Sequence, residues 1–509
     1  MLACAGARAG TRPRLVEAEH TLSEQSRSQH HRPRRGAESG RGGRRSGPPP
    51  RPRDPARRVA YDVLRAVEQR DAYANLLLPV LLSERGVHGR DAALATELTY
   101  GTLRRQGTYD AVLETCVDRT LASVDGEVLP LLRMGAHQLL STNIPPHAAV
   151  GETVDLARRV VGHHRSRFVN AILRKVSARD LEEWTAIVAP ERDRDPSGYL
   201  SVVHSHPRWV VKELARALGE RAKDAGLPRT EELLKAHNER PRVTLVAKPG
   251  RSKVSDLEEA GAEPGRYSPF AAYLPEGDPG AIREVRQNRA AVQDEASQLV
   301  ALALTRVDAH GEDRRWLDMC AGPGGKAGLL ASLAGQRDAR LVASELQPAR
   351  AGLVAGAVRR APRDAGRAIV ADGTRPAWRR EVFDRVLVDV PCTGLGALRR
   401  RPESRWRRSP ENVVELAPLQ RELLTKAVES VRPGGVVAYV TCSPHLDETD
   451  VIVQGVLSER DDLELLRAPD YLDEVPDLAA GPEGRYAQFW PHVHGTDAMF
   501  LALLRKRNG

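Results

Sequence analysis

Two cysteines occupy equivalent places in the chain, 50 residues apart. Cys392 and Cys442 each follow a short apolar run that is typical of a buried strand, and each begins the loop after it. In an open α/β sheet, the loops at the carboxyl ends of the strands build the functional site. Two thiols at one edge of one sheet favour covalent chemistry, because an ionised thiol is a strong nucleophile.

A glycine-rich loop marks the expected cofactor site. Glycine lets the backbone approach a ligand closely, and the N-terminus of the following helix attracts negative charge. A nucleoside triphosphate loop would need Gly in place of Cys320 and Ser or Thr in place of Ala327, and the dinucleotide pattern is met only in part. The loop residues that we assign to a cofactor are Cys320, Ala321, Gly322, Pro323, Gly324, Gly325 and Lys326.

Acidic residues end the next strands of the expected sheet. Glu345 follows the glycine loop by about 20 residues, where ribose hydroxyls are bound in such folds. Asp372 ends the third strand and suits an adenosyl amine. Either acid alone is better explained as a cap or a turn residue, but together with the glycine loop they favour an adenosyl ligand. We also assign Arg350, in the helix after Glu345, and Asp389, three residues before Cys392, to this site.

The elements that must position these residues alternate from about residue 286 onward. This alternation predicts an α/β fold, a Rossmann-like, doubly wound parallel sheet over residues 286–509. The apolar runs 463–466 and 499–504 are expected to complete its far edge. The predicted strands are 316–319, 340–344, 368–371, 385–390 and 436–441, with helices at 325–333, 347–359 and 414–431.

Three further segments precede this sheet. Residues 54–180 carry apolar side chains at the spacing of a buried helix face, which predicts an all-α domain. Residues 181–285 indicate a helical linker and a small α+β subdomain. Residues 1–53 are rich in Arg, Pro and Gly, and we expect a disordered tail. The tail is either a basic arm for RNA or a dispensable extension.

Charge and cysteine content narrow the class of protein. The net charge is +9, but residues 1–53 hold 12 Arg and 4 Glu, a net of +8, so the other residues contribute only +1. Five scattered cysteines without a C-x-x-C pair argue against a disulfide framework and a zinc site. No apolar run is long enough for a membrane span. We therefore expect a cytoplasmic, monomeric protein without a metal.

The motifs together resemble those of a known family. The segments 318–326, 389–394 and 441–443 are similar to signature motifs of the Nop2/Sun family of S-adenosylmethionine-dependent RNA cytosine-C5 methyltransferases, and 292–298 resembles the segment that opens their catalytic domain. Residues 54–180 resemble a NusB-like RNA-binding domain. This fusion is typical of the bacterial Sun/Fmu (RsmB-type) enzymes that modify small-subunit rRNA.

The sequence departs from the family pattern in two places. The family's terminal Asp-Gly-Phe-Phe stands here as Asp497-Ala498-Met499-Phe500, and the acidic pair and Asn after the second cysteine stand as Asp447-Glu448-Thr449. We expect both departures to be peripheral to the reaction.

The resemblance implies a reaction and a set of roles. Adding a thiolate to C6 of a cytosine makes C5 nucleophilic toward the methyl group of S-adenosyl-L-methionine. Asp389 would hold N3 and N4 of the base. First principles do not separate the two thiols, and the Pro-Cys motif of DNA cytosine-C5 methyltransferases would nominate Cys392 as the nucleophile. The family instead implies that Cys442 attacks and that Cys392 assists release.

Arginine clusters supply the candidate RNA contacts. Six Arg residues follow Cys392, with Trp406 among them, and Arg and Trp both stack on bases. A second cluster lies near a turn at 158–170, where a solvated face and phosphate binding are equally open. The residues assigned to RNA are Lys326, Arg399, Arg400, Arg405, Arg165 and Arg167.

The predicted substrate is a cytosine of 16S rRNA. One alternative is the same chemistry on tRNA or another RNA. Another is a non-catalytic NusB-like RNA-binding or transcription factor, against which the intact Cys392, Cys442 and Asp389 argue.

Overall fold

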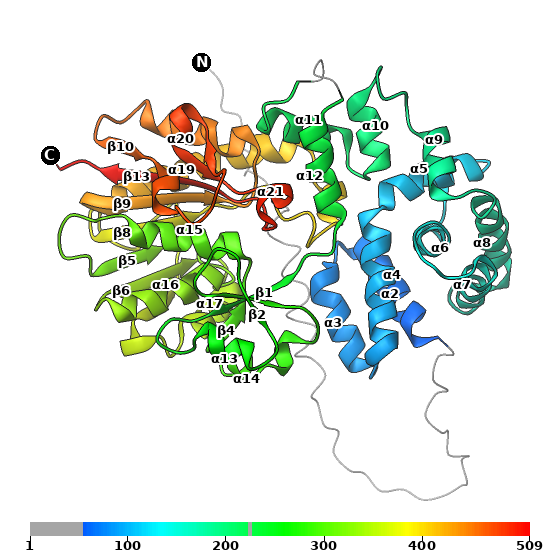
Figure 1. The fold of residues 1–509 in the computed structure, drawn as a ribbon, viewed down its shortest axis with the longest axis horizontal. Coiled ribbons are helices and arrows are strands. Elements are labelled where there is room, and N and C mark those ends of the chain that lie inside the picture. Colours follow the sequence, from blue (N-terminus) through cyan, green and yellow to red (C-terminus); the bar gives the residue numbers. More distant parts are fainter. Residues whose placement is uncertain (1–53, 222–225, 509) are drawn as a thin grey trace, which may run out of the picture.

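The computed structural model describes residues 54–221 and 226–508, which form a helical N-terminal part, a small sheet and a large sheet (Figure 1). The predicted tail at 1–53 lies outside the described residues.

The N-terminal domain is built around one enclosed helix. α6 (Leu129–Ser141) is buried on nearly all sides, which is typical of a helix surrounded by others. Figure 1 shows it end-on, between its neighbours. Trp184 of α9 (Leu181–Val188) is buried in the same core and donates its indole N–H to the Val176 carbonyl, so the domain extends past the predicted boundary at 180. The helices around α6 are α2 (Pro55–Arg70), α4 (Gly89–Arg104), α5 (Gln106–Cys116), α7 (Pro146–Val160) and α8 (Gly162–Val176).

A second group of helices joins this domain to the rest. Its members are α10 (Pro196–Val203), α11 (Arg208–Ala217) and α12 (Pro228–Asn238). Their apolar side chains share one core with Leu395, Leu398 and Trp490 of the C-terminal part. The predicted helical linker is therefore packed against the C-terminal domain.

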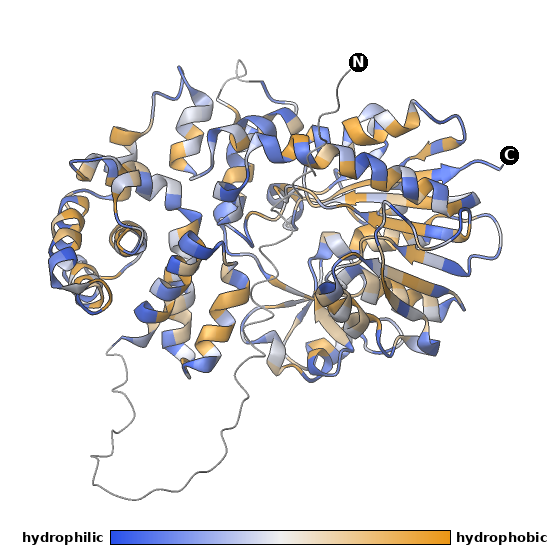
Figure 2. Ribbon diagram, turned by 180° about the vertical axis from the view of Figure 1, so that it is seen from behind, coloured by the Kyte–Doolittle hydropathy of each residue, from blue (hydrophilic) through white to orange (hydrophobic). Residues whose placement is uncertain are grey.

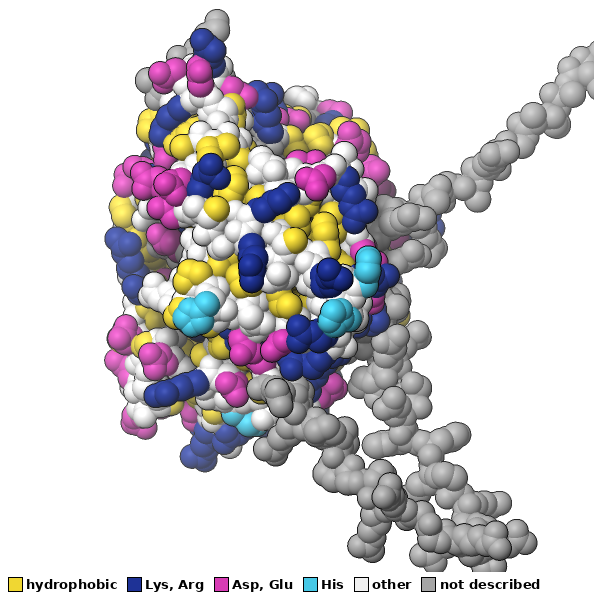
Figure 3. All heavy atoms as spheres, turned by 90° about the vertical axis from the view of Figure 1, so that its right-hand side faces the viewer, with side chains coloured by type: hydrophobic (Ala, Val, Ile, Leu, Met, Phe, Trp, Pro, Cys, Tyr) yellow, Lys and Arg dark blue, Asp and Glu magenta, His cyan; other side chains and the backbone are white. Residues whose placement is uncertain are grey.

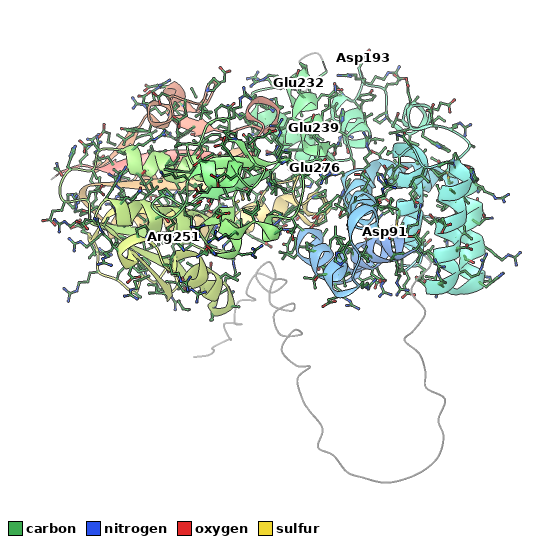
Figure 4. All side chains as sticks on the ribbon, turned by 60° about the horizontal axis from the view of Figure 1, so that its bottom comes forward. Asp91, Asp193, Glu232, Glu239, Arg251 and Glu276 are labelled. Atoms are coloured by element: carbon green, nitrogen blue, oxygen red, sulfur yellow. The ribbon has the colours of Figure 1, made fainter. Side chains whose placement is uncertain are left out.

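The small sheet follows, in the strand order β2-β3-β1-β4 with antiparallel neighbours. Its strands are β1 (Val243–Ala247), β2 (Glu263–Pro264), β3 (Ala271–Leu274) and β4 (Ala290–Val292). β4 lies beyond the predicted boundary at 285, so this subdomain continues to residue 292. Arg251, which Figure 4 labels, donates to the carbonyls of Asn288 and Arg359 and so ties the subdomain to the large one.

The large sheet is mixed, with a parallel core. Its strand order is β11-β12-β13-β9-β8-β5-β6-β7, with β10 also paired to β13. The five strands from β9 to β7 are parallel, whereas β13 runs antiparallel to β9. The strands are β5 (Arg315–Asp318), β6 (Arg340–Glu345), β7 (Gly366–Val370), β8 (Phe383–Asp389), β9 (Val431–Thr441), β10 (Leu463–Leu466), β11 (Ala479–Ala480), β12 (Tyr486–Gln488) and β13 (Phe500–Lys506).

Helices cover both faces of this sheet. Successive residues of β8 show the arrangement, because Leu387 packs into one core while Val386 and Val388 pack into the other. Figure 2 shows the strands mainly in the hydrophobic colour, between helices of mixed character. One face carries α15 (Glu295–Arg306), α16 (Gly325–Gln336) and α17 (Pro348–Val358), and the other carries α19 (Pro410–Ser430) and α20 (Asp450–Leu457). The predicted α/β fold, with its all-α domain and small insert, is confirmed.

Candidate active site

One cavity lies where the carboxyl ends of the parallel strands meet. Its volume is about 310 Å³. Cys442 and Asp389 line it, together with the glycine loop after β5, whereas Cys392 is not among the described residues of its wall. The lining residues are Val292, Gln293, Asp294, Ser297, Asp318, Cys320, Ala321, Gly322, Pro323, Gly325, Lys326, Asp389, Arg400, Cys442, Asp497 and Met499.

The two thiols are in contact. Cys392 Sγ and Cys442 Sγ are 3.3 Å apart, because neighbouring strands β8 and β9 deliver their loops side by side. A hydrogen bond from the Cys392 thiol to the Cys442 thiolate lowers the pKa of Cys442 against the effects of burial and of the Asp389 charge, and the charge of Lys326 lowers it further. The same contact, together with burial, raises the pKa of Cys392. The pair therefore ionises first at Cys442.

Lys326 and Asp389 form an ion pair beside Cys442. The Lys326 ammonium donates to the Asp389 carboxylate over 2.7 Å. Burial opposes the charge of Lys326, but Asp389 outweighs it and the pKa of Lys326 is raised. A charged lysine, a carboxylate and an ionisable thiol thus share one wall of the cavity.

The glycine loop is shaped around an acidic side chain. A Cβ on Gly322 would lie 1.9 Å from Oε2 of Glu345, so no other residue fits there while this carboxylate keeps its place. Arg350 donates to the Gly322 carbonyl over 2.9 Å, and its guanidinium lies 3.9 Å from Glu345. Gly324 adopts a φ of +112°, which favours glycine, at the start of α16. The predicted loop, Glu345 and Arg350 therefore lie together.

Asp318 is a site residue that the sequence reasoning left without a role. It is 1% exposed, and neither of its carboxylate oxygens makes a hydrogen bond within the described residues. Burial and then the charge of Asp389 raise its pKa to about 8, although an interaction with the Cys320 backbone offsets part of that shift. Its place at the end of β5, directly before the glycine loop, was the signal that could have revealed it.

Two other predicted cofactor residues differ in their surroundings. Asp372 accepts hydrogen bonds from the backbone N–H and the hydroxyl of Thr374, which is the pattern of a turn residue, and it does not belong to the cavity wall. Cys320 packs against the core beneath the loop, and burial raises the pKa of its thiol well above the usual range. The Cys320 thiol, like that of Cys392, is therefore kept in its protonated form.

Four charged side chains form a cluster at the cavity, and three of them line it. Arg400 bridges Asp294 and Asp497 over 2.7 and 2.8 Å, and Arg399 reaches the same two carboxylates. Arg400, Asp294 and Asp497 line the cavity. The expectation that the segment from Asp497 to Phe500 is peripheral is wrong, since Asp497 and Met499 are part of the wall.

Arg405 does not face solvent. It is fully buried and donates to the backbone carbonyls of Arg104, Ser205 and His237 and to the Asn238 side chain. These acceptors belong to the helical part of the chain, so Arg405 fastens the segment after Cys392 to that part. The prediction that Arg405 contacts RNA is wrong, because the whole guanidinium is buried, including the Nε–H that has no acceptor, and a phosphate cannot reach it.

Two residues that follow Arg405, Trp406 and Arg407, also hold this segment against the helical part of the chain. Trp406 packs directly on Gly107, where an added Cβ would lie 2.4 Å from the indole. Arg407 donates to the carbonyls of Val67, Asp71 and Ala72. Arg399, with 9% of its side chain exposed, is also held within the protein. Of the arginines assigned to RNA in this segment, Arg400 alone lines the cavity.

The second arginine cluster lies on the outer face of the helical domain. Arg165 is exposed and pairs with Asp125 and Glu127, and Arg167 is exposed. Figure 3 shows Lys and Arg side chains spread over the outer face of this domain, with acidic and apolar ones between them. Within residues 54–221 and 226–508, no helix has the length and apolar character to cross a bilayer, and no cluster of side chains suits a metal ion.

The fold and the cavity together define a Rossmann-like methyltransferase that carries an all-α domain at its N-terminus. Comparison with known proteins agrees: a family model described as 16S rRNA methyltransferase RsmB/F matches residues 305–505, and a NusB family model matches residues 54–178.

Two relatives and one solved structure extend this comparison. A Mycobacterium tuberculosis (H37Rv) protein named "Putative methyltransferase Rv1407" is 50% identical, and the match covers 91% of this chain and 99% of the relative. Ribosomal RNA small subunit methyltransferase B of Escherichia coli O6:K15:H31 is 30% identical over 88% of this chain and 98% of its own length. The crystal structure of PH0851 matches with a TM-score of 0.73 at 22% identity, covering 89% of this chain and 99% of its own, and so shows the shared fold.

The chain belongs to the RsmB/F family of S-adenosylmethionine-dependent small-subunit rRNA methyltransferases. The resemblance noted in the sequence is thereby confirmed.

Proposed function

We propose that this protein methylates C5 of a cytosine in small-subunit (16S) rRNA through a covalent bond between Cys442 and C6 of the base. The observation that carries the proposal is that Cys442 shares the cavity wall with Asp389, Lys326 and the cofactor loop. Its contact with Cys392 and the charge of Lys326 both favour the thiolate form that the reaction needs.

The cavity fits S-adenosylmethionine, which supplies the methyl group when bound. Asp318 offers a buried carboxylate whose oxygens are unpartnered, and this suits the ammonium group of the methionine moiety. Glu345, held against Gly322, suits the ribose hydroxyls. Leu346 and Val370, 54% and 56% exposed beside the end of β6, suit the apolar faces of the adenine.

The chain's own groups divide the remaining work. Asp389 and Lys326 hold the polar edge of the base while charge develops after the Cys442 sulfur adds to C6. Once the methyl group is on C5, a water molecule takes the C5 proton, the C5–H electron pair re-forms the C5–C6 double bond, and the C6–Sγ bond breaks with its electron pair returning to Cys442. Cys392, 3.3 Å away, donates a hydrogen bond to the departing thiolate and so assists release.

RNA binding would involve several surfaces. Arg400 and Lys326 lie at the cavity, and Arg165 and Arg167 lie on the outer face of the helical domain, where phosphates are accessible. The target base must leave its stack to reach a cavity of this kind. We place the reaction in the cytoplasm, where small-subunit rRNA is available.

Bisulfite sequencing of total RNA tests the proposal. Cells that lack the gene should lose one 5-methylcytosine of 16S rRNA, and the wild-type gene should restore it where a Cys442→Ala gene does not. An unchanged rRNA map, or loss of a mark in tRNA alone, would overturn the assignment of the substrate.

A further inference from the structure

A buried carboxylate lies behind the two thiols. Glu448 is fully buried at the end of the short turn Leu446–Glu448, six residues after Cys442. Its Oε1 accepts from the Thr393 backbone N–H over 2.8 Å and from the Gln420 amide over 3.1 Å, and its Oε2 accepts from the Thr393 hydroxyl over 2.5 Å. No ion pair of Glu448 is present in the described part of the chain, so only neutral donors satisfy it.

These hydrogen bonds join the loops of the two thiols. Thr393 directly follows Cys392, and its hydroxyl also lies 3.2 Å from that of Ser443, which directly follows Cys442. The Gly396 N–H donates to the Cys442 carbonyl over 2.8 Å, and Tyr439 donates to the Glu448 carbonyl over 2.8 Å. Glu448 therefore stands at the centre of a network that fixes one thiol loop against the other.

We propose that Glu448 is a positioning residue that sets the contact between Cys392 and Cys442 and thereby enables Cys392 to assist release of the methylated base. This inference rests on the proposed function. Burial of a carboxylate among neutral partners carries a desolvation penalty, which a loop anchor with an uncharged side chain would avoid. The negative charge supplies the reason, because it disfavours a second thiolate beside Cys442.

The groups around Cys392 support a role for Glu448 in keeping that thiol protonated. Cys442 and Tyr439 face it from β9 and its loop, Asp389 faces it from β8, and Glu448 faces it from the turn. After the contact with Cys442 and burial, the charges of Glu448 and Asp389 also raise the pKa of Cys392. The charges of Lys326 and Arg401 have the opposite effect on Cys442 and lower the pKa of that thiol. The two sulfurs thus keep unequal protonation while they remain in contact.

The test uses the full-length protein with Glu448→Gln, which keeps the size of the side chain and one oxygen acceptor. Asp447→Asn is the matched control, because its carboxylate is 43% exposed and pairs with Arg216 on α11. With unmodified RNA and S-adenosylmethionine, Glu448→Gln should turn over at least tenfold more slowly, and a covalent protein–RNA adduct should accumulate. Its adduct with 5-fluorocytosine RNA should form at nearly the wild-type rate, and Cys392 should be alkylated at lower pH than in the wild type.

Thr393→Val supplies a second, independent variant. It removes the hydroxyl partner of Glu448, so the Glu448→Gln and Thr393→Val effects on release should be non-additive in a double-mutant cycle. Normal turnover and no accumulated adduct in folded Glu448→Gln would overturn the inference, as would a lower melting temperature with unchanged release. If the wild-type protein forms no adduct with 5-fluorocytosine RNA, the proposed function fails, which is a separate result.

Discussion

The loops of Cys442 and Cys392 begin at the same edge of the same sheet, on neighbouring strands, yet their surroundings differ. Cys442 lines the cavity with Lys326 and Asp389, whereas the Cys392 loop is bound by Glu448 and continues into the segment that docks on the helical domain. The Cys442 sulfur thus borders the cavity, whereas Cys392 is packed against other parts of the protein. Equal placement at strand ends therefore does not imply equal surroundings, because the side chains behind each loop decide which sulfur borders the cavity.

The largest effect should come from the Cys442 side of this comparison. Asp389→Ala removes the partner of Lys326 and the group expected to hold the base, and the methylation rate should fall roughly 10²–10³-fold. Single-turnover methylation of rRNA measures it. Glu464→Ala is the control, since the Glu464 carboxylate is 48% exposed and pairs with Arg505 outside the cavity wall, and a larger loss there than at Asp389 would break the comparison.

In the segment that follows Cys392, a substitution should lower the stability of the folded protein. Arg405→Ala leaves four buried acceptors without a donor and should lower the free energy of unfolding by roughly 3 kcal/mol. Arg401→Ala, at an exposed position, should cost less than 1 kcal/mol. Denaturant unfolding measures both, and equal effects of the two variants would show that Arg405 does not fasten the domains.

A pH-dependent effect is expected at Asp318. In the folded protein its carboxyl keeps a proton up to about pH 8, while the unfolded chain releases it near 4, so stability is lost as the pH rises between these values, by at most ~1.4 kcal/mol per pH unit. Asp318→Asn cannot ionise and escapes this loss. Without cofactor, it should therefore melt above the wild type at pH 8 and close to it at pH 4, and it should bind S-adenosylmethionine more weakly. A constant difference across pH would contradict the raised pKa of Asp318.

The sequence was informative where local chemistry decides the structure. The strand-end positions of Cys392, Cys442, Glu345 and the glycine loop follow from apolar runs and turn residues, and the structure brings them together. The hydrogen-bond partners of the arginines after Cys392 could not be predicted in this way. Arg405 finds its acceptors between 167 and 301 residues earlier in the chain, and composition does not distinguish a guanidinium that binds phosphate from one that binds carbonyls.

Two other features were missed for related reasons. Glu448 looks like an ordinary acidic turn residue until the Thr393 loop is placed against it. The extension of the small sheet to β4 was not predicted, because the three residues Ala290–Val292 are too few to show a strand pattern of their own. Both depend on a partner that is distant in the sequence.

Covalent trapping on RNA that contains 5-fluorocytosine tests the central claim most directly. The account predicts that the wild-type protein and Cys392→Ala form the adduct, that Cys442→Ala forms none, and that Cys392→Ala also accumulates an adduct with unmodified RNA. An adduct that survives in Cys442→Ala and disappears in Cys392→Ala would reverse the two roles and contradict the account.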